Sequence, residues 1–508
     1  MLDGNFWRCA LLLVGMLWAG GAAASTLITG ALVHDGTGAP GRRSAVRIDG
    51  ARIVAVGNLK QQKRDKVVDG RGLVLAPGFI DGHSHHDGGE YADRTMLPLL
   101  AQGVTTIVVG QDGTSDAPFA VMAARFAARP AAINVAAYTG HGYLRGVAMG
   151  KDYKRTATAA EVSHMQALLA DDVKAGSLGL STGLEYDPGI YSNHAELLAL
   201  ARTTQAGSGR YISHIRSEDV GFDAALDELI DVGAQTGVPV QVSHIKLAAV
   251  SRWGGAKAVL AKLDAARARG IRITADIYPY EYWQSTLTVL LPKRDFTDIA
   301  AARFALTELT TPAGMLLGAY APEPALVGKT IAQIAAARGE EPAKTYLWLI
   351  QTAERFRAAN PQAHGVEAVI GTAMAPADIA DFIAWPHSNI CSDGAIAGRH
   401  PRGAGSFGRI VRQYVREQRV LTLAEAVRKM TGLTAEHLGL AGRGLIRPGF
   451  AADLVLFDAA RFADRATLKE PGALAVGMHM VMVGGAVVYR DGTPTGEFPG
   501  RYLRRGTL

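Results

Sequence analysis

Three histidines fall within four positions of the segment FIDGHSHHDG, which spans residues 79–88. The whole chain has only 14 histidines among 508 residues, so this density is unusual. His83 and His85 are two positions apart, and alternate residues of a strand point to the same side. An H-x-H pair at the end of a strand can therefore direct two imidazoles to one metal ion. His86 faces the other way and is expected in the following loop.

Other residues with metal-binding chemistry also come at the ends of apolar, strand-like segments. They are His214 in RYISHI, His244 in VPVQVSHI, Asp393 in SNICSDG, Glu185 in SLGLSTGLE and Asp112 just after GVTTIVVG. Taken singly, each is compatible with a structural histidine or a turn carboxylate. Taken together with the H-x-H pair, they predict a metal site. Imidazole and carboxylate ligands favour zinc, and manganese, cobalt and iron are alternatives.

This ligand set is large enough for one or two divalent ions. Two ions about 3.5–4 Å apart can lower the pKa of a bridging water to about 7 and polarise a carbonyl group. Asp393 is the candidate general base, which takes a proton from the water and later gives it to the leaving nitrogen. The predicted chemistry is therefore hydrolysis of an amide-like bond.

The segments that position these residues predict an α/β fold of the (β/α)8 TIM-barrel type. Amphipathic helical stretches, such as AEVSHMQALLADDVKAG, separate LAPGFIDGHSH and seven further apolar segments. Those seven segments are 103–110, 132–140, 177–185, 210–215, 238–245, 271–278 and 388–394. In such a barrel the carboxyl ends of the strands carry the active site, which is where the histidines and carboxylates fall.

The two ends of the chain have a different texture, with short β segments separated by glycine and aspartate turns. Residues 25–76 and 441–508 are therefore expected to form a small β-sandwich domain built from both termini. The barrel is then predicted over 77–440. Its stretch at about 288–375 is too long for a simple strand–helix unit, so we expect a mainly helical insertion over the barrel mouth.

Residues 1–24 have the pattern of a signal peptide, with Arg8, the apolar run CALLLVGMLWAG and the small residues GGAAAS. We therefore expect an exported protein, periplasmic or secreted, without stable membrane insertion after cleavage. Cleavage after Ala24 would leave Cys391 as the remaining cysteine, so no internal disulfide is expected.

Composition narrows the classes of partner. The formal net charge is +6 and the pI is about 9.2, but no run of five or six lysines and arginines occurs. Nucleic-acid binding is therefore not predicted. The mild positive excess suits a small anionic substrate. The sequence leaves the oligomeric state open.

An ordered series of motifs resembles the amidohydrolase superfamily, and within it the D-aminoacylase (N-acyl-D-amino-acid deacylase) family. The motifs are PGFIDGHSHHD, GVTTIVVG, TGHGYLRG, GSLGLSTGLEYDPG, SHIRSE, SHIKLA, DIYPYEYWQSTL, SDGA with HPRG, and RPGFAADLVLFD. The resemblance covers about 28–505. It implies a metal-dependent barrel with a small β-sandwich from both termini, and hydrolysis of N-acylated D-amino acids.

The resemblance also implies how the ligands divide. His83 and His85 would hold one metal ion together with Asp393, and His214 and His244 would hold the other. Members of the family have a cysteine after the second strand, whereas this chain has GQDG with Asp112 there. Many amidohydrolases bridge the ions from the fourth strand, so Glu185 is the favoured bridging ligand and Asp112 is the alternative.

Substrate contacts follow from the same resemblance. Lys246, Tyr278 and Ser285 match positions that line the family's pocket. Arg402 and Arg145 are further candidates for binding a substrate carboxylate, because arginine pairs with carboxylates in a bidentate manner. His141 could polarise the substrate carbonyl, and Trp283 offers an apolar wall. Each of these also has an ordinary packing or ion-pair interpretation.

The favoured hypothesis is thus a metal-dependent deacylase of N-acyl-D-amino acids, with a substrate that carries a free carboxylate. The alternative enzyme is a dipeptidase or a cyclic-amide hydrolase on the same scaffold. The more distant alternative is a non-catalytic binding protein. Neither the acyl group, the preferred side chain nor the number of metal ions follows from the sequence.

Overall fold

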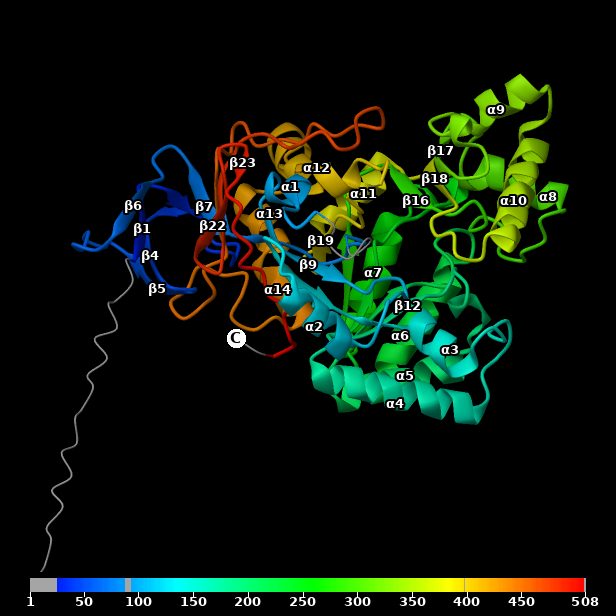
Figure 1. The fold of residues 1–508 in the computed structure, drawn as a ribbon, viewed down its shortest axis with the longest axis horizontal. Helices are drawn as coiled ribbons and strands as arrows, with labels where there is room; N and C mark the ends of the chain where they lie inside the picture. Colours follow the sequence, from blue (N-terminus) through cyan, green and yellow to red (C-terminus); the bar gives the residue numbers. More distant parts are fainter. Residues whose placement is uncertain (1–24, 87–92, 397, 507–508) are drawn as a thin grey trace, which may run out of the picture.

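The computed structural model describes residues 25–86, 93–396 and 398–506 (Figure 1). The predicted signal peptide at 1–24 lies outside these ranges. Strands from the two termini lie at one end of the long axis, an α/β body forms the middle, and an insertion forms the other end (Figure 1). Within the described ranges, no helix is long and apolar enough to cross a membrane.

The middle of the molecule is an α/β fold with parallel sheets, and every predicted strand segment contains a strand. The first parallel sheet has the order β10-β9-β8 and the second has the order β11-β12-β13-β14-β15-β19. Their bounds are β8 (Phe79–Asp81), β9 (Val104–Val109), β10 (Asn134–Ala137), β11 (Thr139–Gly140), β12 (Gly179–Gly183), β13 (Arg210–His214), β14 (Val240–Val242), β15 (Ile273–Ile277) and β19 (Ser388–Ile390). Buried strands of this kind are apolar on both faces, which explains the continuous apolar segments.

Helices connect successive strands and cover the outside of the sheets. They are α2 (Phe119–Ala128), α3 (His141–Met149), α4 (Ala159–Ala175), α5 (His194–Ala206), α6 (Phe222–Thr236), α7 (Ala256–Ala268) and α11 (Pro376–Ala384), with α12 (Arg402–Arg409), α13 (Leu423–Met430) and α14 (Gly432–Leu438) after β19. In α6, Phe222, Leu226, Leu229 and Ile230 are buried, and their spacing of three and four residues places them on one face. Helix α4 begins with a capping box between Thr158 and Glu161.

Polar contacts join the segment after β8 to the segment after β19. The His85 N–H donates to the Gly394 carbonyl at 2.8 Å, and the Asp393 N–H donates to the His83 carbonyl at 2.8 Å. The Ser392 N–H also donates to the carboxylate of Asp81 at 2.8 Å. The first and last strands of the parallel sheets therefore deliver their polar residues to the same place.

Strands from both termini share two sheets at one end of the molecule. Four N-terminal strands form the sheet β5-β4-β1-β6, and seven strands from both termini form β23-β22-β21-β20-β7-β2-β3. Their bounds are β1 (Thr26–Thr29), β2 (Leu32–Val33), β3 (Arg42–Arg43), β4 (Ala45–Asp49), β5 (Arg52–Gly57), β6 (Lys66–Asp69), β7 (Val74–Pro77), β20 (Leu454–Phe457), β21 (Met478–Val483), β22 (Ala486–Arg490) and β23 (Thr493–Pro494). The antiparallel pairing of β7 with β20 joins the two ends of the chain.

The insertion between β15 and β19 has its own small sheet. The antiparallel order β16-β18-β17 is accompanied by helices, and the sequence analysis did not anticipate this sheet. The elements are β16 (Tyr282–Ser285), α8 (Ile299–Phe304), β17 (Met315–Tyr320), α9 (Ile331–Arg338), α10 (Pro342–Ala359) and β18 (Glu367–Thr372). Buried residues such as Leu317, Tyr346 and Val369 form a separate hydrophobic cluster here. The sheet was missed because its strands lack a clear alternation of apolar and polar residues, although β17 and β18 are each six residues long.

Candidate metal centre and substrate cavity

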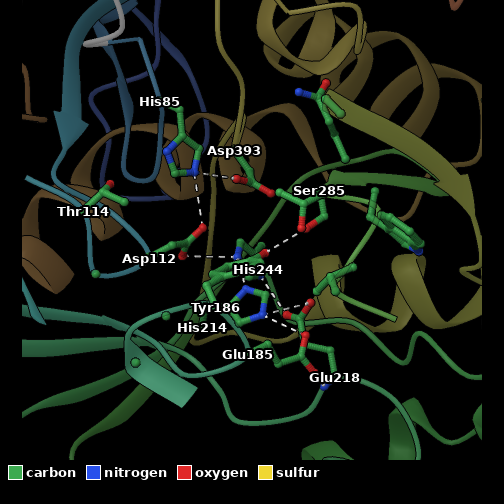
Figure 2. A pocket seen from close by; sticks show the side chains of 18 of the residues that line it. His85, Asp112, Thr114, Glu185, Tyr186, His214, Glu218, His244, Ser285 and Asp393 are labelled. Carbon is green, nitrogen blue, oxygen red and sulfur yellow. Dashed lines mark hydrogen bonds and ion pairs between the residues drawn. The ribbon is translucent and has the colours of Figure 1, made fainter. Parts of the chain in front are cut away.

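The predicted ligands come together at the carboxyl ends of the parallel strands (Figure 2). His83 and His85 follow β8, and Asp112 follows β9. His214 is the last residue of β13, and Asp393 comes three residues after β19. Because parallel strands end at one edge of a sheet, residues far apart in the sequence meet there.

Three of the predicted ligands have a left-handed backbone conformation, which residues other than glycine rarely adopt. The φ angles are 51° for Asp112, 33° for His244 and 50° for Asp393. Left-handed residues other than glycine cost free energy, and they are concentrated at functional sites. Here they turn the chain sharply at the end of a strand, so that the side chain points into the cluster.

Asp112 lies at the centre of the first cluster. Its Oδ1 is 3.4 Å from His83 Nε2 and 3.4 Å from His244 Nε2, and its Oδ2 is 3.2 Å from His85 Nε2. Asp393 Oδ1 lies 3.6 Å from His83 Nε2 and 3.3 Å from His85 Nε2. Ligand atoms of His83, Asp112, His244 and Asp393 all lie within 4.8 Å of one another, which is close enough to surround one ion.

A second group shares His244 with the first and includes a residue that the sequence analysis missed. Ligand atoms of His214, Glu218 and His244 lie within 4.8 Å of one another. Glu218 Oε1 is 2.9 Å from His244 Nδ1, and Glu218 Oε2 is 3.9 Å from His214 Nε2. Glu218 stands in the motif SHIRSE, so its spacing of four from His214 was the available signal.

The geometry reverses the preference for Glu185 as the bridging carboxylate. Glu185 Oε2 lies 3.1 Å from His214 Nε2, and its Oε1 accepts a hydrogen bond from the Glu218 N–H at 2.8 Å. It belongs to neither group of converging ligand atoms found among the described residues. Asp112, which had been the alternative, contacts three of the four predicted histidine ligands.

The cluster strongly favours positive charge. Against the effect of burial, Asp112 and Asp393 raise the pKa of His85 to about 9. Burial and Lys246 act against the charged form of His244, yet Glu218, Asp393 and Asp112 raise the pKa of His244 to about 9. The same field that stabilises a proton on these imidazoles would stabilise a divalent cation between them.

Several buried polar atoms of the cluster lack a hydrogen-bond partner within the described residues. Both ring nitrogens of His83 and Oδ1 of Asp112 are in this state. Buried polar atoms are almost always satisfied in native proteins. Nitrogen and oxygen donors that are buried, converging and unsatisfied are the chemistry expected of a zinc site, so the residues present fit a divalent metal.

Asp276, which the sequence analysis also missed, contacts two of the predicted ligands, His83 and His244. Its Oδ1 accepts the His244 N–H at 2.6 Å and lies 3.6 Å from His83 Nδ1. Against the effect of burial, His83 and His244 lower the pKa of Asp276. A carboxylate on the far side of an imidazole fixes the orientation of the ring and raises its basicity as a ligand. The acid within the strand ITADI was the signal for it.

A cavity of about 580 Å³ opens above the cluster. Lys246, Tyr278, Trp283, Ser285 and Arg402 all line it, as the sequence had suggested. The Tyr278 hydroxyl is buried without a hydrogen-bond partner in the described part of the chain. It is therefore free to contact a molecule in the cavity.

Lys246 and Arg402 are each held against a carboxylate of the cluster. Lys246 Nζ lies 2.7 Å from Glu218 Oε1 and 2.7 Å from His244 Nδ1. Arg402 Nη1 donates to Asp393 Oδ2 at 2.5 Å. Although burial opposes the charge, Arg402 and the neighbouring imidazoles hold the pKa of Asp393 below its usual range.

His141 and Arg145 do not reach the cavity, which corrects their assignment as substrate residues. Both are fully buried. His141 Nε2 lies 2.7 Å from Glu196 Oε1, and Arg145 Nη1 donates to Glu196 Oε2 at 2.6 Å. Their spacing of four in α3 places them on one helix face, and that face is turned toward Glu196 of α5.

His86 is in a turn as expected, but it is buried, with Nε2 3.6 Å from Asp81 Oδ2.

The whole-chain comparisons agree with the class of protein that this fold and site define. Residues 66–489 match the model of the amidohydrolase family. The chain belongs to that family.

Relatives that match nearly the whole chain at 34–37% identity are deacylases. The chain is 37% identical over 505 residues to N-acyl-D-glutamate deacylase from Alcaligenes xylosoxydans xylosoxydans, covering 94% of this chain and 96% of the relative. It is 34% identical to D-aminoacylase from the same organism, covering 94% and 97%. A crystal structure of N-acyl-D-glutamate deacylase from Bordetella bronchiseptica, complexed with zinc and a phosphonate inhibitor that mimics the tetrahedral intermediate, is 35% identical. Its TM-score is 0.84, with 95% of this chain and 100% of that chain covered.

The positions of the two carboxylates predict different effects on metal binding. We expect Asp112→Asn to lower the affinity for zinc by more than about 10-fold, because it removes the charge at the centre of the cluster. Glu185→Gln is the matched control. It also neutralises a carboxylate, but Glu185 contacts just one of the predicted histidine ligands, His214. Metal content after dialysis, with a competitive chelator titration, measures both. A greater loss of zinc in Glu185→Gln would restore Glu185 as the bridging ligand.

Proposed function

We propose that this protein hydrolyses the amide bond of N-acyl-D-amino acids with the help of one or two divalent metal ions, zinc in the first place. One observation carries the proposal: imidazole and carboxylate ligand atoms converge within 4.8 Å beside a cavity that also presents two buried cations. The ring nitrogens of His83 and Oδ1 of Asp112 have no hydrogen-bond partner among the described residues. The deacylases among its relatives support this reaction.

His83, His85 and Asp393 would hold one ion, and His214 and His244 would hold the other, with Asp112 shared between the sites. Glu218 is a further ligand candidate for the second site. A bound divalent ion polarises the amide carbonyl and lowers the pKa of water. This chain supplies only nitrogen and oxygen ligands there, because Asp112 stands in place of the family's cysteine.

Asp393 is the group that would move the proton. Its Oδ1 faces the imidazoles of His83 and His85, and its Oδ2 accepts the hydrogen bond from Arg402. In the ionised form it can accept a proton from the attacking water and then give it to the amide nitrogen, so that the amine leaves neutral. Arg402 holds the carboxylate in place and keeps it anionic.

The α-carboxylate of the substrate would bind at the end of the cavity where Lys246, Arg402 and Tyr278 meet. Ammonium and guanidinium groups recognise carboxylates through charge-assisted hydrogen bonds. The unpartnered Tyr278 hydroxyl adds a donor, and the Ser285 hydroxyl is placed to contact the acyl oxygen. Binding of the remote carboxylate would hold the amide bond over the metal ligands.

We further propose that the two parallel sheets form one closed (β/α)8 barrel over 77–440 and that the terminal segments 25–76 and 441–508 form a β-sandwich. The backbone hydrogen bonds between the segments after β8 and β19 support closure. A hydrophobic cluster that includes Ile28, Ile48, Leu454 and Met480 supports a sandwich, because it draws on both terminal sheets. The insertion about 288–375 then covers the barrel mouth.

Hydrolysis should be stereospecific and depend on metal. With zinc-loaded protein, we expect release of free amine from N-acetyl-D-leucine and at least about 100-fold lower kcat/KM for N-acetyl-L-leucine, and activity should be lost after chelation and return with zinc. An amine-reactive fluorescence assay measures the rate. Absence of hydrolysis for both enantiomers in protein that contains zinc would reject the proposed reaction.

Asp393→Asn should separate the proton-transfer step from metal binding. The amide cannot accept a proton at neutral pH, so kcat should fall by about 10²–10⁴-fold. Most of the bound zinc should remain, since the other ligands are unchanged. Rates and metal content are measured on the same preparation. Wild-type turnover in this variant would exclude Asp393 as the base.

We also propose that residues 1–24 direct export, on the basis of their apolar run and the small residues that follow it. When the full chain is expressed in a Gram-negative host, we expect protein in the periplasm or medium that begins near residue 25. Mass spectrometry of the N-terminus after fractionation tests this. A cytoplasmic protein that retains residues 1–24 would refute the proposal.

A further inference from the structure

The cations of the cavity are gathered at one end. Lys246 and Arg402 are the lysine and arginine side chains that line it within the described residues. Both approach the same ring: Lys246 Nζ is 5.7 Å and Arg402 Cζ is 4.8 Å from the centre of Tyr278. Both also neutralise carboxylates of the cluster, Glu218 and Asp393. This end of the cavity therefore holds the two cations that a single substrate carboxylate could contact.

The insertion contributes an apolar stretch of the wall, which lies beside the polar lining residues Gln284, Ser285, Thr286 and Glu367. The apolar residues are Trp283 of β16, Ala368 of β18, and Val289, Leu290 and Leu309 from the segment between β16 and β17. Trp283 and Leu309 are buried in the hydrophobic cluster of the insertion, and Val289 and Leu290 pack against that cluster. The wall is thus continuous with a packed core, which keeps it in place.

The rest of the lining is rich in carboxylates rather than in cations. Outside the two groups of converging ligand atoms, the acidic residues that line the cavity are Asp116, Glu185, Asp187, Asp219 and Glu367. Asp187 is paired with Arg294 at 3.3 Å, and Glu367 is paired with Arg357. Neither arginine lines the cavity. Both carboxylates are therefore paired with cations that do not line the cavity, and the Glu367 side chain is itself fully buried.

In this arrangement a second carboxylate on the substrate meets no lysine or arginine other than Lys246 and Arg402 among the described lining residues. Beside the apolar wall it would lose its hydration without gaining a partner, which is costly for a charged group. Beside Asp116 or Asp219 it would meet a like charge. An apolar side chain, in contrast, gains free energy in proportion to the area that it buries on the wall.

We propose that this cavity selects N-acyl-D-amino acids with neutral, apolar side chains and discriminates against N-acyl-D-glutamate and N-acyl-D-aspartate. The inference rests on the proposed function. It separates this chain from the N-acyl-D-glutamate deacylase to which it is 37% identical, because a few lining residues decide side-chain preference whereas identity averages over the whole chain.

A panel of zinc-loaded enzyme assays tests the selectivity. The substrates are the N-acetyl derivatives of D-leucine, D-methionine, D-glutamine, D-glutamate and D-aspartate. We expect kcat/KM for D-leucine to exceed that for D-glutamate by at least about 100-fold. D-Glutamine has the shape of D-glutamate without its charge, so it should exceed D-glutamate by at least about 10-fold. A higher kcat/KM for D-glutamate than for D-leucine overturns the selectivity but leaves the deacylase function standing. Absence of hydrolysis of every substrate overturns the proposed function itself.

A cation placed on the apolar wall should weaken the discrimination. In Leu290→Arg, the ratio of kcat/KM for D-glutamate to that for D-leucine should rise by at least about 10-fold. Val54→Arg is the matched control, because Val54 is 45% exposed on β5 in the terminal sheet and receives the same charge. Its ratio should equal that of the wild type.

The fold of each variant is checked by its thermal midpoint and bound zinc. Val289→Arg places the charge on the same wall and replaces Leu290→Arg if that variant does not fold. An unchanged ratio in a folded, zinc-containing wall variant, or an equal change in Val54→Arg, overturns the assignment of this wall to the side chain.

Discussion

The structure is organised around a buried group of acidic and imidazole side chains that attract one another and a cation. Asp112, with a side chain only 8% exposed, lies within 3.4 Å of three imidazoles. A carboxylate in this position would be prohibitively costly to bury alone. The opposite charge around it, on protonated histidine or on a metal ion, makes the arrangement stable. The fold has to bring these groups together from five strands, and that requirement accounts for much of its detail.

The surrounding elements hold the cluster rigid. Asp276 of β15 accepts the backbone N–H of His244 and lies 3.6 Å from His83 Nδ1. Asp81 accepts the N–H of Ser392, which joins the first and last strands of the parallel sheets. Beneath them, Phe79 of β8 stacks on Phe407 with the ring centres 5.9 Å apart, and it also contacts Phe457 of β20 at 6.1 Å. The terminal strands are therefore packed directly under the first strand of the site, and residues of the insertion line the cavity. The terminal strands and the insertion lie at opposite ends of the long axis (Figure 1). A rigid floor and a separate wall allow the chemistry to stay constant while the wall adapts to a particular substrate.

Much of the fold and part of the site could be predicted from local pattern. Each parallel strand was visible as an apolar segment, because strands buried on both faces leave no polar alternation. His83, His85, His214, His244 and Asp393 could be recognised because each follows such a segment. The small sheet of the insertion could not, because its strands are defined by their pairing with one another. Glu218 and Asp276 were present in quoted motifs, but nothing local distinguishes a carboxylate that faces an imidazole from one that faces solvent.

The sequence by itself determined the class of chemistry: imidazoles and a carboxylate at the ends of successive strands must converge, since parallel strands end at a common edge. Only the tertiary structure decided which residues converge at the metal centre and which line the cavity. The choice of Asp112 over Glu185 depends on a left-handed turn after β9, and the exclusion of His141 and Arg145 depends on which face α3 turns toward α5. The charge of the cavity wall depends on arginines that pair away from it. The direction in which a side chain points is set by packing among segments that are distant in the sequence. Residue type and spacing alone do not specify it.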